Sequence, residues 1–144
     1  MLGPLQIVAS ERGLQRLEWS EAAPVGPPNI VAAAQEQLAE YFAGRLRVFD
    51  LPLDPVGTDF QRRAWLALVG IPYGETRTYG EQARRLGLAH GARAIGSANA
   101  RNPLPVVIPC HRLVGSTGRL TGYAGGLERK AQLLRLEGAL PITV

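Results

Sequence analysis

Cys110 is the residue of this chain with the most recognisable chemistry, because it is the only cysteine among 144 residues. It lies in Pro109-Cys110-His111-Arg112 and follows an apolar run, residues 104–108, that should hold it inside the fold. A thiol flanked by a histidine and an arginine lies in electropositive surroundings, which favour the thiolate. Since the thiolate is the nucleophile, this stretch predicts a reactive cysteine and not an inert packing residue.

The composition narrows the class of protein. A chain of 144 residues fits one domain, or one domain with a small appendage, and a hydrophobic fraction of 46% is enough for a core. One cysteine excludes an intramolecular disulfide and a cysteine-based zinc cluster, and it fits a reducing cytosol. The N-terminus lacks the pattern of a secretory signal, and no apolar run approaches the length of a membrane span. We therefore expect a cytoplasmic protein.

The charge is unevenly distributed along the chain. Residues 1–57 hold four arginines against seven acidic residues, a net charge of −3. Residues 58–144 hold twelve basic residues against five acidic ones, a net charge of +7. A basic C-terminal part that carries the cysteine favours a polyanionic partner, with nucleic acid as the first candidate. A solvated, arginine-rich surface is the alternative.

The N-terminal part predicts a small α/β cap. Residues 5–9 and 14–19 alternate as two strands of a hairpin. After a Pro/Gly-rich connector, Asn29 is the expected N-cap of an amphipathic helix over residues 30–43. The prolines within residues 51–55 predict an extended segment. We place a domain boundary here, which gives an N-terminal domain of residues 1–57 and a C-terminal domain of residues 58–144.

The C-terminal part predicts a mainly helical domain, so the fold class is α+β. Thr58 and Thr78 each begin a capping box, which predicts helices that run to about Val69 and Leu86. A four-residue turn leads to another helix over residues 92–100, and this pair has the helix-turn-helix pattern. A last helix is expected from Leu127 to Glu137, with Gly138 as its stop.

The predicted helix over residues 92–100 is unusually rich in Ala, Gly and Ser. A helix that reads the major groove usually offers several long polar side chains to the bases. Small residues instead allow a close approach to the minor groove, which is about 6 Å wide. Arg93 is then the one long side chain at the start of the helix. Tight packing in a core explains the same composition equally well.

Six blocks of the chain resemble the O6-alkylguanine-DNA alkyltransferases, also called methylated-DNA–protein-cysteine methyltransferases. Pro-Cys-His-Arg alone would be weak evidence, but six blocks in the right order and spacing are a specific match over residues 58–138. The resemblance implies DNA repair by direct damage reversal, in which an alkyl group moves irreversibly from guanine O6 to Cys110. The six blocks are 78–79, 92–96, 101–103, 108–112, 122–126 and 136–138.

The resemblance also implies how the protein reaches its substrate. A minor-groove helix-turn-helix binds double-stranded DNA and extrudes the damaged nucleotide, at a cost of a few kcal/mol. By position, Arg93 fills the vacated stack and Tyr79 crowds the phosphate of the flipped nucleotide. The alternative for Tyr79, an aromatic contact between helices, is less favoured by its neighbours. The small residues expected against the DNA are Ala92, Ala94, Gly96 and Ser97.

Three further residues have implied catalytic roles. A Glu–His–water relay that activates the cysteine maps onto Glu137 and His111. Asn102 is expected to tie the recognition helix to the segment that carries Cys110. Because water does not cleave a thioether, each molecule should react once. No cofactor is needed, since the damaged DNA is the alkyl donor.

The remaining implied residues line the substrate pocket. Tyr123 resembles a tyrosine that donates to the guanine, and Lys130 could stabilise charge near the site or be a plain surface residue. Ala124 replaces a hydroxyl residue that many members of the family carry. The five pocket residues are Tyr123, Ala124, Pro105, Leu113 and Lys130. We expect no metal, a monomer, and a cytoplasmic protein that associates with the nucleoid when bound to DNA.

Three other functions compete with alkyl transfer. A damage sensor of the alkyltransferase-like type would bind the lesion but lacks the acceptor cysteine. A helix-turn-helix regulator needs major-groove contacts that the Ala/Gly-rich helix makes poorly. A cysteine hydrolase needs an oxyanion hole and turnover, and nothing in the sequence identifies an acyl substrate. Acceptance of O4-alkylthymine as a second substrate is left open.

Overall fold

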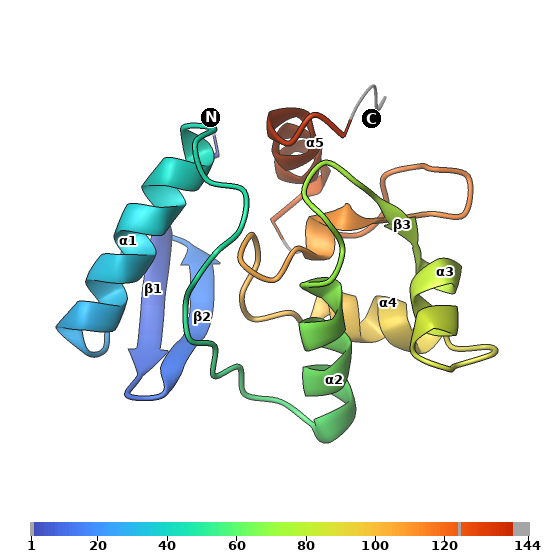
Figure 1. Ribbon diagram of the computed structural model, residues 1–144, viewed down its shortest axis with the longest axis horizontal. Helices are drawn as coiled ribbons and strands as arrows, with labels where there is room; N and C mark the ends of the chain where they lie inside the picture. Colours follow the sequence, from blue (N-terminus) through green and yellow to red (C-terminus); the bar gives the residue numbers. More distant parts are fainter. Residues whose placement is uncertain (1, 124, 140–144) are drawn as a thin grey trace. The chain divides into compact units, whose positions relative to one another are not determined.

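Contacts divide the chain into two compact units, both drawn in Figure 1. Unit 1 contains Met1–Gly57 and Pro103–Pro105, and unit 2 contains Thr58–Asn102 and Val106–Val144. The structure is a computed structural model and describes residues 2–123 and 125–139. Its secondary structure is mixed, which confirms the predicted α+β class.

Unit 1 is an antiparallel hairpin covered by one helix. Strands β1 (Leu5–Ser10) and β2 (Gly13–Trp19) pair in the register that puts Ile7 opposite Leu17. Helix α1 (Pro28–Phe42) packs against β1, as Figure 1 shows at the blue end of the colour scale. Alternating strand residues and helix residues three or four apart thus share one core. Its buried side chains are Ile7, Ala9, Leu14, Leu17, Ile30, Val31, Ala34, Leu38 and Tyr41.

The start of α1 differs from the prediction. The helix begins at Pro28, Pro27 occupies the N-cap position, and no side chain caps the helix. The prediction that Asn29 is the N-cap was therefore wrong. Proline suits the first helical position because its φ is already helical and its missing N–H would have no partner there. Consecutive prolines therefore begin this helix earlier than the capping rule predicts.

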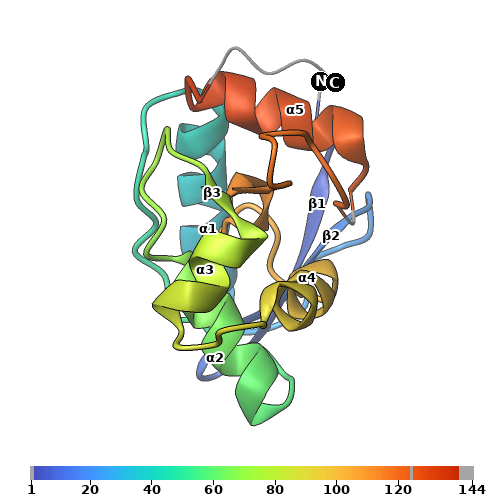
Figure 2. The same cartoon turned by 90° about the vertical axis from the view of Figure 1, so that its right-hand side faces the viewer.

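The helices of unit 2 begin where the sequence predicts. Helices α2 (Asp59–Leu68) and α3 (Tyr79–Arg85) both open with complete capping boxes, at Thr58 and Thr78. Helix α4 (Ala92–Ala100) follows α3 and contacts it (Figure 2). The last helix, α5 (Leu127–Leu136), ends one residue before the predicted limit. In the core of the unit, the Trp65 indole donates to the Ala98 carbonyl at 2.7 Å and joins α2 to α4.

A short parallel ladder connects the start of α3 to the segment that carries Cys110. The sequence did not predict it. Strand β3 (Arg77–Thr78) pairs with β4 (Leu113–Val114). The 3₁₀ turn η1 (Cys110–Arg112) runs directly into β4, and β3 runs directly into α3. Two-residue strands have no periodic pattern to read. The ladder fixes the first turn of α3 beside the chain that leaves the cysteine.

Candidate active site

Cys110 lies at a sharp, well-anchored bend. Pro109 has φ −79° and ψ 64°, the geometry of an inverse γ-turn, and the Cys110 N–H donates to the Ile108 carbonyl at 2.7 Å. The turn η1 continues the bend, with the Arg112 N–H 3.0 Å from the Pro109 carbonyl. The thiol side chain is only 3% exposed. The apolar run before it is buried as predicted, so the cysteine is held inside the fold.

Two asparagines connect the end of α4 to this bend. Asn102 donates its amide to the Ile108 carbonyl at 2.9 Å, and Asn99 donates to the Cys110 carbonyl at 3.4 Å. Both side chains are buried. The structure thus gives Asn102 the contact that its expected role requires. Asn99 has no counterpart among the sequence predictions.

The electrostatic setting of the thiol differs from the prediction. Burial raises the pKa of Cys110 from 9.0 to about 11, although the Asn102 hydrogen bond and the Lys130 charge act in the opposite direction. The expectation that neighbouring cations favour the thiolate was therefore wrong for the free protein. The guanidinium of Arg112 does not compensate the thiol, because it is paired with a carboxylate. At neutral pH Cys110 is therefore held as a protonated thiol.

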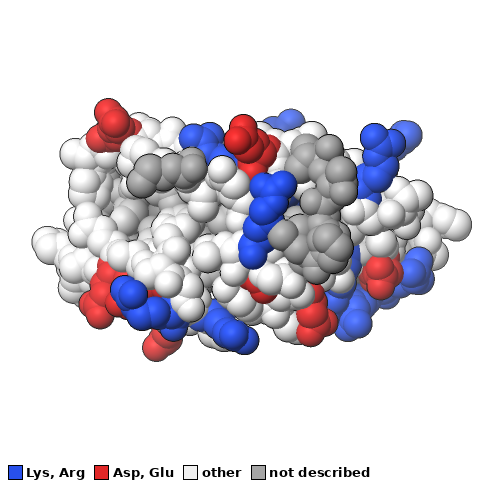
Figure 3. All heavy atoms as spheres, turned by 90° about the horizontal axis from the view of Figure 1, so that it is seen from above, with Lys and Arg blue, Asp and Glu red and all other residues white. Residues whose placement is uncertain are grey.

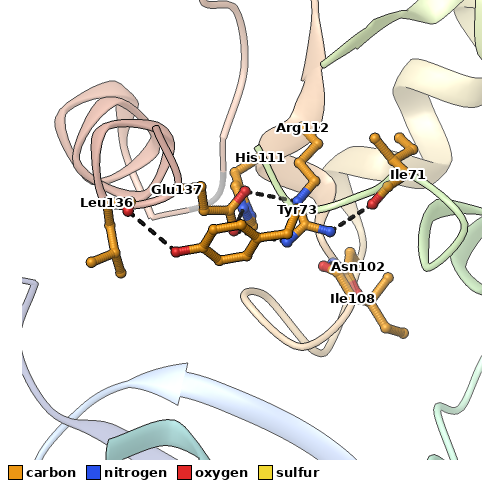
Figure 4. A network of polar contacts seen from close by, with 8 residues as sticks. All are labelled: Ile71, Tyr73, Asn102, Ile108, His111, Arg112, Leu136 and Glu137. Atoms are coloured by element: carbon orange, nitrogen blue, oxygen red, sulfur yellow. Dashed lines mark hydrogen bonds and ion pairs between the residues drawn. The ribbon is translucent and has the colours of Figure 1, made fainter. Parts of the chain in front are cut away.

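Glu137 is the carboxylate that organises the residues after Cys110 (Figure 4). Its Oε2 lies 2.8 Å from His111 Nε2. Arg112 donates two hydrogen bonds to the same carboxylate, from Nε at 2.8 Å and from Nη2 at 2.9 Å. The carboxylate and imidazole are fully buried, and the guanidinium is nearly so. The bidentate pair fixes the carboxylate in both position and plane.

His111 is arranged as a neutral base. Burial lowers its pKa below the ordinary value, against the opposing hydrogen bond from Glu137. A carboxylate accepts hydrogen bonds, so the neutral imidazole carries its proton on Nε2 and leaves a lone pair on Nδ1. Among the described residues, the buried Nδ1 atom has no hydrogen-bond partner. An unpaired acceptor next to the cysteine can take a proton.

Arg112 is held by more than Glu137. Its Nη1 donates to the Ile71 carbonyl at 2.6 Å, and its guanidinium lies 5.7 Å from the centre of the Tyr73 ring. The Tyr73 hydroxyl donates to the Leu136 carbonyl at 3.2 Å, beside Glu137 (Figure 4). From the sequence, Arg112 was predicted only as a charge near the thiol, and Tyr73 was not predicted to belong to the site. A buried pair between distant positions leaves no local signal in one sequence.

Lys130 and Tyr123 also lie close to the thiol. Lys130 is fully buried and not a surface residue, and its Nζ donates to the Thr121 carbonyl at 2.7 Å. Burial lowers its pKa to about 8, while Cys110 acts in the opposite direction. Burial, reinforced by Cys110, raises the pKa of Tyr123 well above its ordinary value. The Tyr123 hydroxyl is buried and has no hydrogen-bond partner among the described residues.

The other predicted pocket residues are placed differently. Leu113 is fully buried in β4, directly after η1. Pro105 is buried but belongs to unit 1, whereas Cys110 belongs to unit 2. Ala124 lies outside the described residues. The structure therefore places Leu113 in the same unit as the cysteine and Pro105 in the other unit.

Four of the six predicted DNA-contact residues line a groove of about 850 Å³ between α3 and α4, namely Tyr79, Ala92, Arg93 and Gly96. Helix α4 turns Ile95, Ala98 and Asn99 into the core, so its other side faces solvent. The predicted contacts Ala92, Arg93, Ala94 and Ser97 are exposed. The lining residues are Thr78, Tyr79, Gly80, Glu81, Arg84, Ala92, Arg93, Gly96 and Ser116. The small residues of α4 therefore form an accessible surface, with Ala98 as the small residue used for packing.

Tyr79 stands at the first turn of α3 and is held from two sides. A Cβ atom added at Gly96 would lie 3.8 Å from the Tyr79 ring, an ordinary contact distance. The Tyr79 hydroxyl meets Thr121, 3.3 Å from its Oγ1 and 3.5 Å from its carbonyl oxygen. Tyr79 thus contacts α4 and also lines the groove, while its contact with a phosphate stays a prediction.

Surface charge alone does not mark the site. On the face shown in Figure 3, basic and acidic side chains are interspersed. Within the described parts of the chain, no group of three or more His, Cys, Asp or Glu is placed to hold a metal ion. No helix there has the length and apolar character needed to cross a bilayer. The chemistry is concentrated in the buried thiol and its neighbours.

Comparison with known families matches both parts of the chain. Residues 59–139 match the family described as "6-O-methylguanine DNA methyltransferase, DNA binding domain". Residues 1–55 match "6-O-methylguanine DNA methyltransferase, ribonuclease-like domain". Together the two matches span nearly the whole chain.

Individual relatives agree with the family matches. The methylated-DNA–protein-cysteine methyltransferase of Mycolicibacterium paratuberculosis is 50% identical over 95% of this chain and 80% of its own length. The protein of the same name from Methanosarcina acetivorans is 44% identical over 96% of this chain and 94% of its own. The crystal structure of Mycobacterium tuberculosis OGT in complex with DNA superposes with a TM-score of 0.85 at 47% identity, and covers 96% of this chain and 88% of that one.

Proposed function

This chain belongs to the 6-O-methylguanine DNA methyltransferase family and is a DNA-repair enzyme that transfers alkyl groups from DNA to cysteine, and we propose that Cys110 is its acceptor for the alkyl group on guanine O6. The observation that carries the proposal is the buried thiol next to a histidine whose Nδ1 has no partner among the described residues. The contact between His111 and Glu137 supplies a base and a group that orients it, beside the nucleophile in the sequence.

The thiol must lose its proton as it attacks, because its pKa of about 11 keeps it protonated at neutral pH. His111 Nδ1 is the base we propose, acting through a water as the resemblance implies. The imidazolium formed is stabilised by Glu137, which already accepts from Nε2. Arg112 keeps this carboxylate oriented. Because the thiol loses its proton to His111 only as it attacks, its high pKa does not prevent the reaction.

The bonds and protons balance in one displacement. The Sγ–carbon bond forms while the carbon–O6 bond breaks, and the electron pair of the broken bond stays on guanine. One proton leaves the thiol and one reaches guanine, so no oxidant, reductant or cofactor is consumed. Tyr123 is the proton donor to guanine that we propose, since its buried hydroxyl has no partner among the described residues. Lys130 adds positive charge to this site.

Access to the damaged base uses the groove between α3 and α4. We propose that the exposed small residues of α4 approach the minor groove and that Arg93 enters the stack in place of the flipped nucleotide. Tyr79 faces the same groove and would press on the phosphate beside that nucleotide. The first turn of a helix suits a phosphate, because its free N–H groups and dipole favour an anion.

Several finer points stay predictions. They are the division into two domains at residue 57, the monomeric state, and the cytoplasmic, nucleoid-associated location. The use of O4-alkylthymine is open. Among the alternatives, a damage sensor of the alkyltransferase-like type would not need the acceptor Cys110, whose surroundings are built for proton removal.

A duplex with one O6-methylguanine tests the proposed function from the DNA side. The duplex is incubated with an equal amount of protein and digested to nucleosides, and O6-methylguanine is quantified against guanine. We expect one lesion repaired per protein molecule, and none with Cys110→Ala. Tight binding with an intact lesion would support a damage sensor instead. Preference for one undamaged sequence would support a regulator.

A further inference from the structure

Asn99 makes a contact that the proposed mechanism does not use. It lies on the buried side of α4 and is 6% exposed. Its amide Nδ2 is 3.4 Å from the carbonyl oxygen of Cys110 itself. The carbonyl is an acceptor, so the amide must turn its nitrogen toward it. The Oδ1 atom then faces other described residues without a hydrogen-bond partner.

A buried asparagine lowers the stability of the fold unless its polar atoms are paired. An unsatisfied buried acceptor destabilises the fold, and an apolar residue of similar size would avoid that cost. The Cys110 carbonyl already accepts the Leu113 N–H at the end of η1. Asn99 is therefore not required to satisfy this carbonyl. What Asn99 adds is a connection between α4 and the peptide of the nucleophile.

The first two turns of α4 carry residues that line the groove. Arg93 and Gly96 line the groove, while Asn99 points into the core one to two turns later. Asn102 makes a second contact from the end of the helix to Ile108. A shift of α4 on binding a duplex would thus reach the cysteine segment at two points. Binding energy from parts of a substrate remote from the reaction can be used to orient reacting groups in this way.

We propose that Asn99 is a positioning residue, which transmits the position of DNA-bound α4 to the Cys110 peptide and so aligns Sγ for displacement. The inference rests on the proposed function of Cys110. The distance of 3.4 Å from Asn99 Nδ2 to the Cys110 carbonyl oxygen is long for a hydrogen bond. Such contacts are often long in a free enzyme and shorten in the complex with substrate. In this case the shortening would accompany the binding of α4 to DNA.

Two substrates that carry the same alkyl group separate this role from a structural one. The first is a duplex with one O6-benzylguanine, and the second is the free base O6-benzylguanine, which does not engage α4. Single-turnover rates are measured for wild type, Asn99→Leu and Asn99→Ser. Leucine keeps the volume without the donor, and serine keeps polarity without the reach. Ala100→Ser, an exposed position of α4 with no role here, is the control.

We expect Asn99→Leu to slow transfer from the duplex about tenfold, equivalent to one hydrogen bond of about 1.4 kcal/mol. Transfer from the free base and affinity for undamaged duplex should change less than twofold. Equal losses on both substrates, or no loss on the duplex, would overturn the inference. If leucine prevents folding in a thermal melt, Asn99→Ser decides by the same criteria. Absence of transfer to wild-type Cys110 would instead contradict the proposed function.

Discussion

The protonation of Cys110 is not controlled by the charged neighbour that its sequence context suggests. Arg112 follows His111 directly, yet its charge is directed to Glu137 and not to the thiol. Burial dominates, and the free protein keeps Cys110 protonated. A buried, protonated thiol is protected from adventitious oxidation, because thiolate character and exposure govern that reaction. In the proposed mechanism, reactivity is supplied only when His111 removes the proton.

The buried Arg112–Glu137 pair should be essential to stability as well as to chemistry. Arg112→Met leaves the fully buried Glu137 carboxylate without its bidentate partner. Breaking such a pair costs about 3–5 kcal/mol, which urea unfolding can measure. The control is Arg45→Met, which removes an exposed, solvent-screened pair with Glu40 and should cost far less stability. A cost for Arg112→Met no larger than that of the control would contradict the assigned pairing.

Lys130 gives the stability a specific pH dependence. Its folded-state pKa of about 8 lies below the ordinary 10.5, so the unfolded chain holds this proton more tightly. Between these values the contribution of Lys130 to stability rises with pH as the buried cation becomes neutral. Cys110 acts oppositely above pH 9, because its pKa is raised from 9.0 to about 11. The effect of Lys130 on stability is therefore best measured between pH 8 and pH 9, below the range in which Cys110 opposes it.

Calorimetric melts of wild type and Lys130→Met at pH 7.5, 8.0, 8.5 and 9.0 test this sign. The Tm of wild type should rise relative to that of the variant across the window. The variant lacks the titrating group, so groups common to both proteins cancel in the comparison. A difference in Tm that stays constant, or that moves in favour of the variant as the pH rises, would show that Lys130 is not a buried cation.

At the scale of elements, the parts that local rules control were predictable from the sequence. Both capping boxes and the limits of α4 follow from residues close together in the chain. The β3–β4 ladder did not, because two residues carry no periodicity. The contacts of Glu137 with Arg112 and of Tyr73 with Leu136 join distant positions. The raised thiol pKa could not be predicted either, since burial depends on the completed fold.

The capping box of α3 should matter for DNA and not only for stability. Thr78→Ala removes the cap beside Tyr79, and Thr58→Ala removes the matching cap of α2 away from the groove. Each change should cost about 1 kcal/mol of stability. Only Thr78→Ala should also weaken duplex binding, by several-fold, because the first turn of α3 moves with Tyr79. Fluorescence anisotropy with a labelled duplex checks this, and equal affinities for the two variants would argue against the assigned DNA surface.

At the scale of the whole molecule, repair should alter the protein permanently. Cys110 is 3% exposed in a packed interior, so a methyl group on Sγ has little free space. Adding a methyl group to a tight site costs about 1–3 kcal/mol. The Tm of the methylated protein should fall by on the order of 5 °C. A scanning calorimetry melt before and after reaction with the duplex checks this, and an unchanged or raised midpoint would exclude the predicted loosening.

The central claim is that the alkyl group ends on Cys110, once per molecule. The most direct measurement is mass spectrometry of the intact and digested protein after reaction with excess duplex that carries O6-methylguanine. The account predicts one added methyl group, located on the peptide with Cys110, that saturates at one per protein and is absent in Cys110→Ala. A methyl group on another residue, or repaired DNA with unmodified protein, would contradict it.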